Sequence, residues 1–195
     1  DAGLHPEIFI PLHRVIQNFK LPVQYLNDLL KAFEQDVTAS ANASTYADMN
    51  DLLSYCKLSA NPVGRLLLHL YGVQDEASLA QSDAICSALQ LINFWQDLSE
   101  DIPRGRYYLP QDQAAKLSNS ELLEFLCQHA HQLMISGAPL VHKVPGRAGW
   151  ELRLVVQGGM RILEKVRQLG PRALHTRPRL RPWDLPLMLW RSLWM

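Results

Sequence analysis

The chain has 195 residues, of which 48% are hydrophobic, enough for one folded domain with a sizeable core. We therefore interpret residues 1–195 as a single domain. Lys+Arg and Asp+Glu both number 19, and this zero net charge argues against a nucleic-acid-binding protein, which needs a basic surface. The sequence contains no apolar run long enough to span a membrane and no N-terminal signal pattern.

The cysteines indicate the cell compartment, and the first residue indicates whether an upstream segment is expected. Cys56, Cys86 and Cys127 lie in apolar helical contexts and form no CxxC pair, which indicates buried free thiols and a cytoplasmic protein. The chain begins at Asp1 without a methionine, so we expect that an upstream segment is absent.

Apolar side chains recur at helical spacing from the start of the chain. The first stretch, from Ile8 to Phe19, predicts a helix that Pro11 delays or kinks. A second amphipathic stretch, from Tyr25 to Phe33, follows the break at Leu21-Pro22. The small and polar residues from Asp36 to Tyr46 predict a loop.

The middle of the chain predicts a broken helix followed by a long one. The broken helix begins near Ala47, is interrupted at Asn61-Pro62 and stops at Gly72, because proline disfavours the helical conformation in the residue before it. The long helix runs from Glu76 to Glu100, and residues Ile102 to Lys116 predict a loop.

Two more helices and a short terminal segment complete the pattern. Ser118 and Ser120 are candidate caps of the next helix, and residues 137–146 form a connection. A helix from about Arg147 ends at Gly170-Pro171, and a short segment follows from Pro182 to Met195. Because no stretch shows sustained strand alternation, the predicted fold class is all-α, a helical bundle.

A polar stripe crosses the end of the long helix. Its members follow one another at steps of three, four and four, which places them on one helical face: Gln90, Asn93, Asp97 and Asp101. Carboxylates one turn apart repel each other, and paired oxygen ligands suit Mg²⁺, which binds one or two carboxylates together with substrate phosphates. Arg104 and Arg106 just beyond suit a diphosphate ligand.

Three features of the sequence can be explained either by a functional role or by ordinary packing and solvation. Acidic pairs at this spacing are also common on solvated helices. Gly158-Gly159 inside a strong helix fits either a close helix crossing or a substrate channel. Trp183, Trp190 and Trp194 lie near arginines, which fits either ordinary packing or an interfacial membrane patch.

Two blocks of sequence resemble a known family. The segment QLINFWQDLSEDIPRGRYYLP, residues 90–110, resembles the second aspartate-rich motif of the squalene and phytoene synthase family. The segment YCKLSANPVGRLLLHLYG, residues 55–72, resembles that family's other central signature, and the order and separation of the two also match. The segments ANPVGR and NFWQD, and the stretch from Leu152 to Val166, most resemble the sequences of the bacterial branch that forms hydroxysqualene for hopanoids.

The resemblance implies a class I isoprenoid (terpenoid) synthase bundle and a Mg²⁺-dependent enzyme acting on a prenyl diphosphate. It implies that Asp97 and Asp101 are catalytic metal ligands. It implies that Tyr55 is catalytic and presents its ring to a carbocation. The implied substrate-binding residues are Ala60, Val63, Gly64, Gln90, Asn93, Arg106 and Tyr108, and Tyr55, Ala60, Val63 and Gly64 are expected to wall the prenyl-chain cavity.

The implied reaction converts presqualene diphosphate to hydroxysqualene, without reduction by NADPH. One alternative is a squalene or phytoene synthase that condenses two prenyl diphosphates, and another is a non-catalytic helical fragment or partner subunit. We expect no nucleic-acid partner, and we consider peripheral membrane contact and a homodimer.

The sequence departs from the family pattern in three places. No acidic motif occurs before Tyr55, although the family has one there, so we expect this chain alone to bind diphosphate poorly. Thr45 stands where the branch has an arginine, and Gln96 stands where the wider family often has one. Without covering helices, we expect the apolar side chains Leu89, Ile92 and Trp95 to be uncovered and the chain to self-associate.

Overall fold

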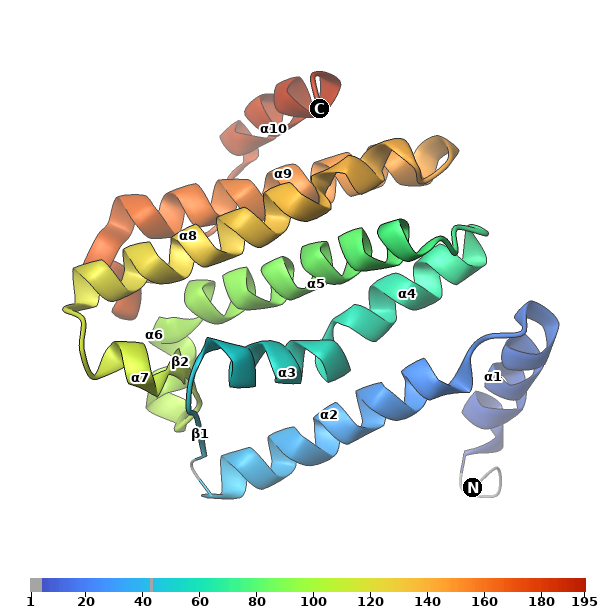
Figure 1. Ribbon diagram of the computed structural model, residues 1–195, viewed down its shortest axis with the longest axis horizontal. Helices are drawn as coiled ribbons and strands as arrows, with labels where there is room; N and C mark the ends of the chain where they lie inside the picture. The colour runs from blue at the N-terminus through green and yellow to red at the C-terminus, as the bar shows by residue number, and fades with distance from the viewer. Residues whose placement is uncertain (1–4, 43) are drawn as a thin grey trace.

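The computed structural model describes residues 5–42 and 44–195, and in this part of the chain nearly all regular structure is helical. The long helices lie side by side in a bundle (Figure 1). The α-helices are α1 (Pro6–Phe19), α2 (Val23–Asn42), α3 (Met49–Ser59), α4 (Asn61–Leu70), α5 (Glu76–Gln96), α6 (Leu98–Asp101), α7 (Gln111–Ala114), α8 (Asn119–Gly137), α9 (Gly146–Leu169) and α10 (Leu185–Leu193). Short 3₁₀ turns connect them at η1 (Ile102–Arg104), η2 (Ala138–His142), η3 (Gly170–Leu174) and η4 (Pro182–Asp184). The predicted all-α class is confirmed.

Helix α5 is the central element, because it contacts α3, α4, α8 and α9. Its buried side chains include Leu91, Ile92 and Trp95, the last with no exposed surface. The expectation that Ile92 and Trp95 are uncovered was therefore wrong, and Leu89 is half-buried. The reason is that α8 and α9 already cover this side of α5.

The predicted loop from Asp36 to Tyr46 was wrong for its first half, since α2 continues as a helix to Asn42. Alanines in this stretch are strong helix formers. The Thr38 hydroxyl donates a hydrogen bond to the carbonyl oxygen of Glu34 (2.9 Å), so it is compatible with the helix. Asp36 is also held, because its Oδ2 accepts a hydrogen bond from the Tyr55 hydroxyl (2.7 Å).

The predicted loop from Ile102 to Lys116 contains η1, α7 and a short strand, which the sequence pattern did not show. Strand β1 (Thr45–Tyr46) pairs in parallel with β2 (Tyr107–Pro110). These strands are too short to produce a readable alternation of apolar and polar side chains. They bring the segment after the acidic residues next to the connection between α2 and α3.

The break at Asn61-Pro62 is confirmed, since α3 ends at Ser59 and α4 begins at Asn61. Asn61 is buried, and its Oδ1 accepts a hydrogen bond from the Ser87 hydroxyl on α5 (2.9 Å). Arg65 on α4 also donates two hydrogen bonds to Asp83 on α5, 2.9 and 2.6 Å long. The break therefore changes the direction of the chain between α3 and α4. Polar contacts then hold α4 against α5.

The C-terminal half follows the expected pattern closely. Ser118 caps α8 in a reciprocal arrangement with Glu121, as the sequence predicts. The connection between α8 and α9 contains η2, and α9 begins at Gly146. A Cβ added at Gly159 would lie 2.8 Å from Leu89 and 3.0 Å from Met134, so α9 crosses α5 and α8 closely there.

The N-terminal helices are poorly covered. Helix α1 has no buried residue, and α2 buries only Ala32. Large exposed apolar side chains on these two helices are Ile8, Phe9, Ile10, Leu12, Val15, Phe19, Val23, Leu30, Phe33 and Val37. No helix in the described residues is long and apolar enough to cross a bilayer.

Candidate active site

The polar stripe lies where α5 ends. The prediction of one uninterrupted helix from Glu76 to Glu100 was wrong in detail, because α5 ends at Gln96 and α6 begins at Leu98. The interruption is slight, since the Asp101 amide still donates to the Asp97 carbonyl oxygen (2.8 Å). Asn93 Nδ2 donates to Asp97 Oδ2 (3.2 Å), so these two side chains share a face as expected.

Asp97 is paired with an arginine that lies 80 positions away in the sequence. The Nε of Arg177 donates to Asp97 Oδ1, and its Nη2 donates to Asp97 Oδ2 at 3.2 Å. The same Nε lies 3.7 Å from Glu100 Oε1. Arg177 belongs to the segment after η3, which Gln96 anchors by donating to the Pro178 carbonyl oxygen (2.8 Å). Residues 171–195 contain five arginines, which were the available signal, but sequence spacing could not place one of them beside Asp97.

Asp101 lies in a different environment from Asp97. It is half-buried, and burial together with the nearby Asp97 carboxylate raises its pKa, while Arg106 and Arg104 oppose that shift. The backbone amide of Arg106 donates to the Asp101 carbonyl oxygen (3.0 Å). The structure thus brings Arg106 next to the acid pair, as the sequence predicts, with its side chain exposed.

An aromatic cluster occupies the space beside the acid pair. The rings of Phe94 and Tyr108 are stacked at a centroid distance of 4.0 Å. Tyr55 is buried, and its ring centroid lies 6.1 Å from that of Phe94 and 6.2 Å from that of Tyr108. The ring centroid of Tyr46 lies 5.9 Å from that of Tyr55. Burial and the hydrogen bond to Asp36 raise the pKa of Tyr55, so its hydroxyl stays protonated.

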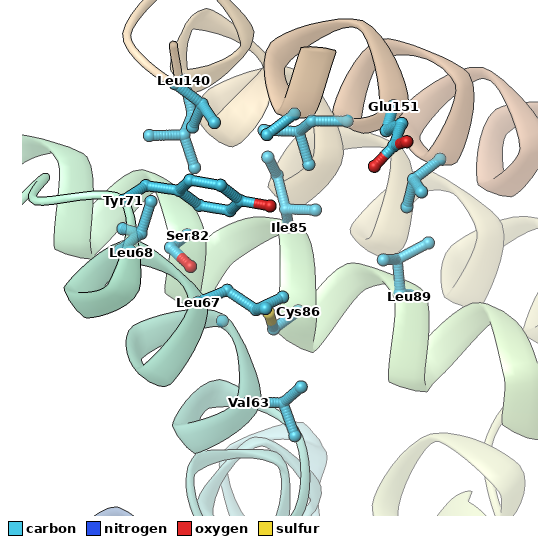
Figure 2. Close-up of a pocket in the computed structure, with 15 residues that line it drawn as sticks. Val63, Leu67, Leu68, Tyr71, Ser82, Ile85, Cys86, Leu89, Leu140 and Glu151 are labelled. Atoms are coloured by element: carbon cyan, nitrogen blue, oxygen red, sulfur yellow. The ribbon is translucent and has the colours of Figure 1, made fainter. Parts of the chain in front are cut away.

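A cavity of about 350 Å³ opens between α4, α5, η2 and α9 (Figure 2). Its lining is almost entirely apolar: Val63, Gly64, Leu67, Leu68, Tyr71, Ser82, Ile85, Cys86, Leu89, Leu140, Val144, Ala148, Glu151, Leu152 and Val155. The structure therefore places Val63 and Gly64 at a cavity wall. Tyr55 and Ala60 are not among the lining residues, since Tyr55 lies in the aromatic cluster and Ala60 at the break between α3 and α4.

Gly64 also has a packing role. A Cβ at this position would lie 2.4 Å from Ser82 Oγ and 2.5 Å from Cys86 Sγ, so α4 and α5 meet closely here. A large side chain at Gly64 would push the helices apart as well as fill the cavity.

A second groove of about 410 Å³ continues the cavity along α5 and α9. Leu89 and Val155 line both spaces, and the second groove reaches Asn93 and Gln96. An apolar path therefore runs from Tyr71 to the start of the acid pair. Gln90, half-buried on α5, lies one turn before Asn93.

The donor set is suited to half of a Mg²⁺ site. Asp97 and Asp101 provide carboxylates one turn apart and Asn93 provides an amide oxygen, which suits a cation that takes its other ligands from phosphate and water. The described residues contain no cluster of three or more His, Cys, Asp or Glu side chains that could hold a metal alone. Asp97 must also exchange its contact with Arg177 for the metal.

The apolar groove along α5 and α9 thus reaches Asn93, whose side chain donates to Asp97. A family profile described as squalene/phytoene synthase matches residues 3–184. The chain belongs to this family.

Individual relatives of known sequence are synthases of the same family. The chain is 30% identical over 194 residues to a hydroxysqualene synthase of Sinorhizobium fredii, which covers 91% of this chain and 64% of that protein. It is 27% identical over 186 residues to a 15-cis-phytoene synthase of Pantoea ananas, covering 88% of this chain and 59% of that protein. The chain thus spans less than two thirds of these relatives' length.

Solved structures confirm the bundle type. The squalene synthase HpnC from Alicyclobacillus acidocaldarius aligns with a TM-score of 0.75 at 31% identity, covering 83% of this chain and 65% of that one. A dehydrosqualene synthase aligns with a TM-score of 0.72 at 20% identity, covering 93% and 68%, which supports the fold alone.

Proposed function

We propose that this chain forms one wall of a prenyl diphosphate site in an enzyme that converts presqualene diphosphate to hydroxysqualene. The observation that carries the proposal is the apolar path along α4, α5 and α9 that ends at Asn93, beside Asp97. The apolar chains of the substrate lie along this path, and its diphosphate lies at the acid pair. The 30% identity to a hydroxysqualene synthase favours this branch over its alternatives.

The residues divide the chemistry between them. Asp97 and Asp101 would hold Mg²⁺, with Gln90 and Asn93 beside them, and the bound ion would supply positive charge to offset that of the departing diphosphate. The carbon–oxygen bond breaks, the diphosphate leaves with the electron pair, and the cyclopropylcarbinyl cation rearranges. Water then adds and loses a proton, which gives hydroxysqualene without a reductant.

The aromatic cluster and the exposed arginine complete the site. The ring of Tyr55 stabilises the cation through its π face, while Asp36 holds the hydroxyl in place. Tyr108 lies against Phe94 and extends the same aromatic surface, and Arg106 contacts the diphosphate. Ala60, at the break between α3 and α4, leaves room for the substrate beside Tyr55.

Two alternatives have their own support. The 27% identity to a phytoene synthase favours condensation of two prenyl diphosphates. The ion pair between Arg177 and Asp97 favours a non-catalytic partner subunit, because it occupies a carboxylate that Mg²⁺ needs.

Incubation with presqualene diphosphate, with and without a reduced nicotinamide, tests the reaction, and mass spectrometry reads the product. We expect hydroxysqualene in both cases from an active form of the protein. In that form Asp97→Asn should abolish Mg²⁺-dependent diphosphate release with an unchanged circular dichroism spectrum, whereas Glu76→Gln, exposed at the start of α5, should not. Near-normal turnover of Asp97→Asn would contradict the metal role.

A second comparison tests the path for the prenyl chains. Leu67 lines the cavity and Leu70, one turn later, does not, although both are about half exposed. Leu67→Trp should therefore block a long prenyl substrate, and Leu70→Trp should leave turnover unchanged. Equal effects of the two variants would place the substrate elsewhere.

A further inference from the structure

Helix α10 presents an apolar half to solvent. Its other half packs on α9, where Ser192 is buried and donates a hydrogen bond to the Met188 carbonyl oxygen (2.8 Å). The exposed half, which we call the α10 face, carries no charged residue: Leu185, Pro186, Leu189, Trp190, Leu193 and Trp194. Figure 1 shows α10 at the opposite side of the bundle from α2.

The segment that precedes the α10 face, residues 171–184, is basic. The only acid between residues 171 and 195 is Asp184, which is buried with its carboxylate against Arg161 (2.8 Å) and Lys165 (2.7 Å). It therefore adds no negative charge to the surface. Arg179 and Arg181 are exposed beside it.

A groove of about 340 Å³ lies along this basic segment, and Trp183 forms part of its wall. Lys165 and Arg177 in the groove pair with Asp184 and Asp97 respectively. Arg179 has only a distant partner, Glu100 at 3.8 Å. The groove thus keeps cationic groups available to a ligand, and we call it the basic groove.

Tryptophans next to the arginines support the same interpretation. The Arg181 guanidinium lies 5.0 Å from the ring centroid of Trp183, and the Arg153 guanidinium lies 5.2 Å from that of Trp150. Both rings are exposed. Tryptophan and arginine together are typical of the boundary between lipid tails and headgroups, where an apolar ring and a cation are both satisfied.

We propose that the α10 face lies in the interfacial layer of an anionic lipid bilayer, with lipid phosphates at the basic groove. An amphipathic helix with tryptophan and leucine on one half and arginines at its border binds such a surface. In a symmetric contact between two copies, the same surface would meet itself, and the α10 face offers no acidic group to Arg179 and Arg181. This proposal concerns where the chain binds and does not depend on the reaction proposed above.

Co-sedimentation of the 195-residue chain with vesicles tests the proposal, using neutral phosphatidylcholine and the same lipid with about a third phosphatidylglycerol. We expect binding to the anionic vesicles and a blue shift of tryptophan emission. Replacing Trp190 and Leu193 by serine should weaken binding about ten-fold or more, since each replacement removes an apolar side chain that the bilayer would bury. The matched control replaces Leu30 and Phe33 on α2, which are exposed to the same degree (59% and 64%, against 60% and 58%).

A charge pair gives an independent readout that does not alter α10. Arg179→Gln with Arg181→Gln should weaken binding to anionic vesicles about thirty-fold, at roughly 1 kcal/mol for each arginine. Arg14→Gln with Arg147→Gln, also exposed, should have a much smaller effect. Absence of vesicle binding, equal binding to neutral and anionic vesicles, or equal effects of test and control pairs would each overturn the proposal. So would loss of a dimer in the α10 variant without any vesicle binding, which would make the face a contact between two copies.

Discussion

At the scale of single residues, Asp97 has two competing partners. Its carboxylate is paired with Arg177, and hydrogen bonding to Asp97 raises the pKa of that arginine. The same carboxylate is the ligand expected for Mg²⁺, and one oxygen pair cannot serve a guanidinium and a metal in full. The metal therefore has to compete with an arginine that the chain itself supplies.

Removing Arg177 should strengthen metal binding. The pair is partly exposed, so it is worth about 1 kcal/mol at most, and Arg177→Gln should tighten Mg²⁺ binding up to about five-fold. Isothermal titration with Mg²⁺ and inorganic diphosphate would measure this. Arg172→Gln, exposed in η3, is the control. Weaker binding by Arg177→Gln would show that the arginine assists the ligand and does not compete with it.

Residue positions within a helix could be predicted, whereas contacts between distant segments could not. The spacing of Asn93 and Asp97 on one face follows from helix geometry and is confirmed by their hydrogen bond. The contact between Asp97 and Arg177 joins residues 80 positions apart, and no periodicity in the sequence encodes it. The same holds for the hydrogen bond between Tyr55 and Asp36, which ties the aromatic cluster to α2.

At the scale of elements, the contact between α4 and α5 depends on the absence of a side chain at Gly64. Gly64→Ala should destabilise the fold by about 1 kcal/mol or more, because the added methyl overlaps Ser82 and Cys86 and outweighs the gain in helix propensity. Gly158→Ala is the matched control, since its nearest neighbour is a flexible methionine at 3.4 Å. Urea unfolding would measure both. Equal or higher stability of Gly64→Ala would mean that the two helices separate at little cost.

The attachment of α10 should depend on pH. Hydrogen bonds from Lys165, Arg161 and the Arg181 amide hold the pKa of Asp184 well below its usual range. A carboxylate with a lowered pKa contributes stability above its unfolded pKa of about 4, and this contribution is lost as the pH falls below that value.

We therefore expect α10 to detach from α9 as the pH falls below about 4. Tryptophan emission between pH 2 and 6 would follow this, since Trp190 and Trp194 lie on α10 and at its end. Asp184→Asn should remove this acid transition, and Asp28→Asn on α2 should leave it unchanged. An identical transition in Asp184→Asn would assign it to other carboxylates.

The long amphipathic helices could be predicted from apolar periodicity, and the break at Asn61-Pro62 from the stereochemistry of proline. The extension of α2 through Val37 to Asn42 could not, because small polar residues tolerate both loop and helix. Tertiary contacts decide between these states, and Tyr55 provides one of them by holding Asp36.

At the scale of the whole molecule, the exposed apolar surface of α1 and α2 is the main departure from a well-covered domain. We expect the 195-residue chain to self-associate through this surface and to release no diphosphate. A longer polypeptide with the full length of the relatives should be both monodisperse and active. Size-exclusion chromatography and a Mg²⁺-dependent diphosphate-release assay on both proteins would test this. A monodisperse, active 195-residue chain would contradict it, and the further metal ligands would then be groups such as Asp36.

The pairing of β1 with β2 has a kinetic consequence. Thr45 pairs with Tyr107, so this contact closes a loop that contains α3, α4 and α5, and the Asp112 amide donates to the Ala47 carbonyl oxygen beside it (3.1 Å). Closing so long a loop costs chain entropy that local helix formation does not. We expect the strands to pair after the helices have docked, so that the turn carrying Asp101 and Arg106 takes its final shape late in folding. Pulse-labelled hydrogen exchange should show the amides of this turn becoming protected after those of α5 and α8.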